Sequence, residues 1–77
     1  MAVMAQIQER LAEVIKESEF SQSEIARRIG VKPQQVSCYV KGTKMPAYDT
    51  LSKLCATLGI SSDYILCLEN ADGSKNY

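Results

Sequence analysis

Two closely spaced pairs of helix start and stop signals restrict the fold of this chain more than any other feature. Ser21 and Glu24 predict the start of a helix, because the side chain of each can accept a hydrogen bond from the other's backbone amide. Gly30 predicts its end, since glycine adopts the left-handed conformation that closes a helix. Pro33 then predicts a second start and Gly42 a second end. The expected elements are helices over Gln22–Ile29 and Pro33–Val40, separated by three residues.

Apolar periodicity predicts further helices on both sides of this central pair, and no segment alternates like a strand. Ser61 or Ser62 can cap the last, short helix. From Glu69 onward the apolar periodicity is lost, which predicts a disordered C-terminal tail over 69–77 after a folded domain over 1–68. The expected fold is therefore all-α, and its outer helices are Ala5–Ser18, Tyr48–Leu58 and a short one that ends at Cys67.

The basic residues are concentrated in the central region, although the whole chain is neutral. Nine basic and nine acidic residues give a net charge of +0 at pH 7. Residues 21–53 hold six of the basic residues and only two acidic ones, a net charge of +4, whereas 1–20 and 54–77 each carry −2. A block of positive charge is what a phosphate-binding face requires, so this distribution favours a nucleic-acid partner.

Composition argues against several other classes of site. The chain has no histidine, and Cys38, Cys55 and Cys67 form no CxxC pair, so we predict no metal. The usual acid–base and nucleophilic residue sets cannot be assembled, and there is no glycine-rich phosphate loop, so we predict neither an enzyme nor a cofactor. No segment approaches the roughly 20 apolar residues of a membrane span, and no signal peptide is visible. We expect a cytoplasmic protein without a membrane partner.

The segment Pro33–Val40 has two chemically different faces if it is helical. One face is apolar, and the other carries groups that can hydrogen-bond base edges and phosphates, with no carboxylate to repel DNA. The inward set is Val36, Tyr39 and Val40, and the outward set is Gln34, Ser37, Cys38 and Lys41. Taken alone, the outward set could equally be the solvated surface of an ordinary helix. The adjacent short helix and glycine turn favour DNA binding, because this spacing is typical of a helix-turn-helix.

From about Ile7 to Leu68 the sequence resembles the phage-repressor and Cro family, also called the xenobiotic-response-element (XRE) helix-turn-helix family. The resemblance is carried by the order of matches over residues 20–66, including Gln22, Ala26, Gly30 and Val36. It implies a five-helix lambda-repressor-like DNA-binding domain with a central helix-turn-helix. Lys32 and Ala47 depart from the family, which has a serine or threonine cap at each position, and each departure forgoes about 1 kcal/mol of capping. Tyr39 also departs, since tryptophan or a branched aliphatic residue is common there.

By this resemblance, nine residues are candidate DNA contacts. Gln22 resembles the family's phosphate-binding glutamine, Gln34 and Cys38 are best placed to meet base edges, and Lys41 and Lys44 resemble clamps on the DNA backbone. The full set is Gln22, Lys32, Pro33, Gln34, Gln35, Ser37, Cys38, Lys41 and Lys44. For Cys38 a redox-sensitive thiol is an alternative to a small residue that packs against a base or sugar.

The expected function is sequence-specific binding of double-stranded DNA by a bacterial or phage transcription regulator, repressor-like, acting on a palindromic operator as a homodimer. By analogy with the family, the dimer surface is expected on the last helix, around Ile60, Tyr64, Ile65 and Leu68. The alternative is an antitoxin-type interaction protein that binds a protein partner as well as DNA. The acidic residues of the first helix, Glu9, Glu13 and Glu17, are compatible with that role.

Overall fold

The computed structural model describes residues 3–76 and contains five helices over that range. Met1, Ala2 and Tyr77, which belong to the predicted domain and tail, lie outside the described residues. The helices are α1 (Val3–Glu17), α2 (Gln22–Ile29), α3 (Pro33–Lys41), α4 (Tyr48–Leu58) and α5 (Ser62–Ile65). None of the helices in this range is long and apolar enough to cross a membrane. The all-α prediction is confirmed.

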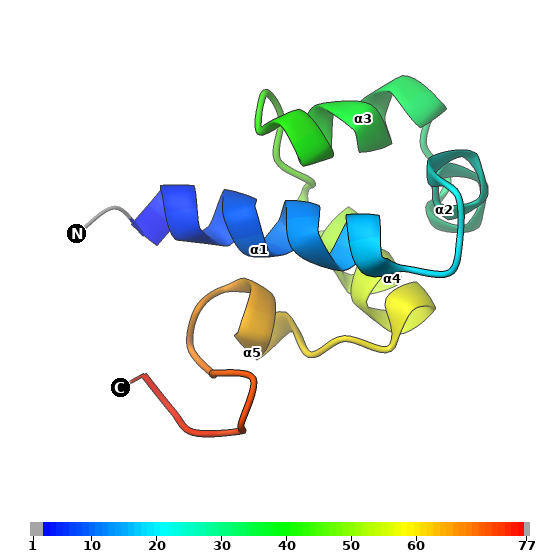
Figure 1. Cartoon of the computed structure of the whole chain (residues 1–77). Coiled ribbons are helices and arrows are strands. Elements are labelled where there is room, and N and C mark those ends of the chain that lie inside the picture. The colour runs from blue at the N-terminus through cyan, green and yellow to red at the C-terminus, as the bar shows by residue number, and fades with distance from the viewer. Residues whose placement is uncertain (1–2, 77) are drawn as a thin grey trace.

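The helices surround one apolar core, and α1 crosses its centre. Figure 1 shows α3 on one side of α1, with α5 and the C-terminal residues on the opposite side. α2 packs against both α3 and α4, and α1 contacts α3 and α5. The buried core comprises Leu11, Val14, Ile15, Ile25, Ala26, Ile29, Val36, Tyr39, Leu54 and Ile65. Since three of these residues come from α2 and two from α3, burial fixes how this pair of helices is oriented within the domain.

The predicted helix ends agree best where a glycine or proline sets them. α2 and α4 have the predicted bounds, and α3 is one residue longer than expected. α1 both starts and ends slightly earlier than predicted. The prediction that α5 continues to Cys67 is wrong, because the helix ends at Ile65 and Cys67 takes a left-handed φ of 64°. The polypeptide therefore turns sharply away after a single helical turn.

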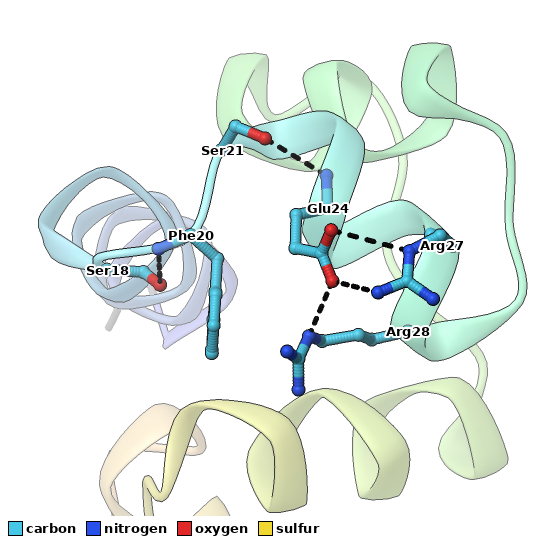
Figure 2. Close-up of polar contacts among 6 residues, drawn as sticks. All are labelled: Ser18, Phe20, Ser21, Glu24, Arg27 and Arg28. Carbon is cyan, nitrogen blue, oxygen red and sulfur yellow. Dashed lines mark hydrogen bonds and ion pairs between the residues drawn. The ribbon is translucent and has the colours of Figure 1, made fainter.

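The start of α2 is capped from one side only. The Ser21 hydroxyl accepts a hydrogen bond from the Glu24 backbone amide at 3.1 Å, as predicted. The Glu24 carboxylate does not return the bond but pairs with Arg27 and Arg28, as Figure 2 shows. Two arginines within one turn are stronger partners for a carboxylate than a neutral amide, which explains the difference.

Residues 69–76, for which the sequence predicts a disordered tail, form a turn after the last helix. Glu69 and Lys75 form an antiparallel bridge, and the Asn76 side-chain amide donates to the Cys67 carbonyl oxygen at 2.9 Å. Arg10 of α1 anchors this turn, because its Nη1 donates to the carbonyl oxygens of Tyr64 and Glu69, both at 2.8 Å. Polar contacts thus order a segment that has no apolar periodicity of its own.

Candidate nucleic-acid interface

The turn between α2 and α3 is built around Gly30, which has φ 78° and ψ 31°. Its backbone amide and that of Val31 both donate to the Ala26 carbonyl oxygen, at 2.9 and 3.0 Å. Any other residue would be strained in this left-handed conformation. Because Pro33 starts the next helix only three residues later, α2 and α3 are held as a rigid helix-turn-helix unit.

The two faces of α3 are those that the sequence predicts. Val36 and Tyr39 are 0% and 3% exposed, and Val40 is half-buried against the core. Burial raises the pKa of the Tyr39 hydroxyl, so this side chain stays neutral in the core. On the other face Gln34 and Lys41 are exposed to solvent. α3 therefore presents its polar face outward, and this face contains no acidic residue.

The nine predicted contact residues fall into an exposed and a half-buried group. The exposed residues are Gln22, Lys32, Pro33, Gln34, Lys41 and Lys44, and the half-buried ones are Gln35, Ser37 and Cys38. α3 carries six of the nine and Lys32 is its N-cap residue, so seven are brought together on one element. Gln22 begins α2, and Lys44 lies in the loop between α3 and α4.

Gln35 supports the start of α3 through its own side chain. Its Oε1 accepts a hydrogen bond from the Lys32 backbone amide at 3.2 Å. Lys32 has no acceptor in its side chain and cannot cap the helix itself. Gln35 therefore supplies one of the two hydrogen bonds of a capping box, and α3 begins directly after Lys32. The Oε1 atom of Gln35 is used within the protein by this bond.

The basic side chains of the central region differ in how free they are. Within the described part of the chain, Lys32, Lys41 and Lys44 make no ion pair. By contrast, Arg27 and Arg28 both bind the Glu24 carboxylate, the latter with Nε to Oε2 at 2.8 Å (Figure 2). Unpaired positive charge therefore lies at the two ends of α3 and in the loop that follows it, and Lys53 on α4, also exposed and without an ion pair to the described residues, adds to it.

The Glu24 cluster on α2 is a charged surface network. Hydrogen bonds from Arg27 and then Arg28 lower the pKa of the Glu24 carboxyl, and the same pairing raises the pKa of Arg27. The Arg28 guanidinium also lies over the Phe20 ring, 4.3 Å from its centre. These contacts tie α2 to the segment that precedes it, and Figure 2 shows the arginines on the side of α2 away from α3.

Gln8 of α1 is a residue of the site that sequence reasoning missed. Its Nε2 donates to the Gly42 carbonyl oxygen at 3.1 Å. Gly42 closes α3 in the left-handed conformation, with φ 79°, and its own amide donates to the Tyr39 carbonyl oxygen. Gln8 thus anchors the C-terminal end of α3 to α1. Nothing near Gln8 in the sequence marks this role, because its partner lies 34 residues away.

Comparison with known proteins agrees with this geometry. A helix-turn-helix family model matches residues 8–65, which is most of the chain. The solution structure of the SOS-response transcriptional repressor LexA from Eubacterium rectale is similar, with a TM-score of 0.75 and 28% sequence identity over 96% of this chain and 77% of that one. No curated protein gives a significant match. The chain belongs to the XRE-type helix-turn-helix family of DNA-binding transcription regulators.

Proposed function

We propose that this protein is a repressor-like regulator that binds a palindromic operator in double-stranded DNA as a homodimer, with α3 in the major groove. The observation that carries the proposal is the outward face of α3, which is polar, free of carboxylates and bordered by three lysines that make no ion pair with any described residue. A helix of nine residues fits a major groove, and the small side chains of Ser37 and Cys38 allow close approach to the bases.

In this proposal the residues of α3 divide into readers and supports. Gln34 reads a base edge, because an exposed amide can donate and accept at the same time. Ser37 and Cys38 pack close to bases or sugars, and Pro33 contributes only apolar contact, for example to a thymine methyl group. Gln35 acts on the DNA indirectly, since it holds the start of the helix through the Lys32 amide.

The remaining candidates hold the DNA backbone. Lys32, Lys41 and Lys44 neutralise phosphates, and each adds to the salt dependence of binding without adding sequence preference. Gln22 is exposed at the first position of α2, where its amide can donate to a phosphate oxygen beside the helix N-terminus. Backbone contacts of this kind fix the register in which α3 meets the bases.

Selection of bound sequences from random duplex DNA tests this function. We expect enrichment of one motif with two inverted half-sites whose centres lie about 10 base pairs apart, since a two-fold dimer places its recognition helices one helical turn apart. An enriched single half-site would reject the homodimer but keep specific DNA binding. Recovery of no motif at all would reject sequence-specific binding.

An antitoxin-type protein is the second candidate, supported by the exposed carboxylates of Glu9, Glu13 and Glu17 along α1. In Figure 1 this helix lies between α3 and α5, and a partner on its outer side would leave α3 accessible. Purification of the natively expressed protein distinguishes the two functions, because an antitoxin would be recovered with a stoichiometric protein partner.

A further inference from the structure

Exposed apolar side chains gather around one groove at the end of the molecule where α1 begins. The groove has a volume of about 170 Å³ and lies between the first turn of α1, the loop after α3, the start of α4 and α5. Its rim includes Met4, Met45, Tyr48 and Leu66, while Leu11 and Ile65 form part of its floor. None of the nine residues that line it carries a charge.

The side chains on the rim of the groove are largely exposed to solvent. Tyr48 is 93% exposed and Met4 57%, and Met45 and Leu66 are exposed by 36% and 37%. These four residues make up most of the exposed large apolar side chains between residues 3 and 76. Contiguous apolar surface of this kind marks an interaction site, and the absence of charge in the lining means that the partner must present an apolar surface too.

We infer that the occupant of this groove is a second copy of the chain, docked through a two-fold axis so that Tyr48 of each copy enters the groove of the other. A two-fold interface requires a patch that is complementary to itself. This patch meets that requirement, because a protruding aromatic ring stands directly beside a hollow of the size of one large side chain.

The place of the groove supports the same occupant. Lys44 directly precedes Met45, so the groove opens beside the loop that we propose to contact phosphates. A second copy docked there would present its own α3 to the same DNA molecule, as a palindromic operator requires. The inference therefore rests on the proposed function and names the surface through which the two copies meet.

This surface differs from the one that the family resemblance predicts. Ile65 is 1% exposed and belongs to the core, and Ile60 packs against it. The Tyr64 hydroxyl donates to Glu13 Oε1 at 2.9 Å, and its ring lies under Arg10. The fold therefore already uses three of the four side chains expected to form the dimer surface, and only Leu68, at 42%, is exposed.

The dimer should be weak in the absence of DNA. A standard stable interface buries about 800 Å² on each partner, roughly a sixth of this chain's 4959 Å². One groove that accepts a single side chain falls short of that area, so DNA that holds two copies side by side is expected to supply the rest of the binding free energy.

Sedimentation equilibrium with matched variants tests the inference. Wild-type protein, kept reduced and measured up to millimolar concentration, should rise from its 8.5 kDa monomer mass toward twice that value. Tyr48→Ser and Leu66→Ser should each raise the dissociation constant of the dimer at least about tenfold, since a central aromatic or aliphatic anchor is lost. Leu68→Ser, at a position about as exposed as Leu66 but outside the groove, should associate like wild type.

Either of two outcomes would overturn the inference: a wild-type protein that stays monomeric at every concentration, or groove variants that associate as well as Leu68→Ser. Tyr48→Ser keeps the test valid even if Leu66→Ser folds poorly, because Tyr48 is almost fully exposed. Each protein is also titrated with a random-sequence duplex of about 10 base pairs, too short for two half-sites. Equal binding by all four would separate a failed dimer from a failed DNA interface, and absence of binding by wild type would count against the proposed function alone.

Discussion

Replacement of Arg10 by alanine should destabilise the domain without changing how the folded protein binds DNA. The Arg10 guanidinium donates to two backbone carbonyl oxygens at 2.8 Å and lies 4.6 Å from the centre of the Tyr64 ring. Arg10 is half-buried on α1, and its contacts hold both the last helix and the C-terminal turn against α1. Because these elements lie across α1 from α3, the effect should stay on that side of the molecule (Figure 1).

The size of the effect follows from the three strongest contacts that the substitution removes, because the fourth, from Nη2 to Asn70 Oδ1, is long at 3.5 Å. A hydrogen bond from a charged group contributes about 1.5 kcal/mol at the low end of its range, and a cation over an aromatic ring about 0.5 kcal/mol. Solvent reaches this half-buried site and screens it, so we expect a loss of about 2 kcal/mol in the free energy of unfolding, less than the simple sum. For a domain of this size that corresponds to a fall in Tm of roughly 8–16 °C. A total stability of about 4–11 kcal/mol would leave the variant folded.

Urea unfolding measures the loss directly, with Lys16→Ala as control, since Lys16 is an exposed cation on the same helix. We expect Arg10→Ala to lower the midpoint with little change in the slope, and amide hydrogens in residues 69–76 to exchange faster. A loss below about 0.5 kcal/mol, no larger than a typical surface substitution, would show that the C-terminal turn is not anchored by this residue.

Three further substitutions test other parts of the account. Val36→Asp should abolish folding, read as loss of far-UV circular dichroism, because it places an unpaired carboxylate at a site with 0% exposure, and a folded variant would mean that the faces of α3 are reversed. Gln8→Ala should cost about 1 kcal/mol of stability and weaken specific DNA binding of the folded protein, since the Gly42 end of α3 is released; unchanged affinity would limit Gln8 to a stabilising role. Glu24→Gln should lower the urea midpoint at pH 7, but it should have little effect at a pH below the pKa of Glu24 in the folded protein, where this carboxyl is protonated. The lowered pKa of Glu24 means that its stabilising effect is present above the unfolded pKa and lost as pH falls, so an equal difference from wild type at pH 7 and pH 2 would contradict the pairing.

The central helix pair could be predicted from sequence because its limits are set by local chemistry. Gly30, Pro33 and Gly42 act through their own backbone preferences, which need no knowledge of the rest of the fold. The inward face of α3 could also be predicted from sequence, since the apolar periodicity that defines it lies within one short segment. The DNA-contact roles on the outward face remain predictions, because the burial of one face does not identify what the other face binds.

The contacts that sequence reasoning missed are those between residues far apart in the chain. Gln8 meets Gly42 over 34 residues, and Arg10 meets Glu69 over 59. Neither polar residue has a neighbour that signals its partner, so the C-terminal turn looked unstructured. The apolar groove is also invisible locally, because Met4, Tyr48 and Leu66 come together only when three separate helices pack.

The central claim is that α3 reads bases while the lysines around it hold the backbone, and Gln34→Ala tests it most directly. Its affinity for the selected operator and for random duplex is measured at several salt concentrations, with Lys44→Ala as the matched control. We predict that Gln34→Ala costs about 1–3 kcal/mol on the operator and much less on random DNA. Lys44→Ala should weaken both by a similar factor and lower the slope of log affinity against log salt by about one. If Gln34→Ala weakened binding to operator and random DNA equally, Gln34 would not read a base, and the proposed docking of α3 would be contradicted.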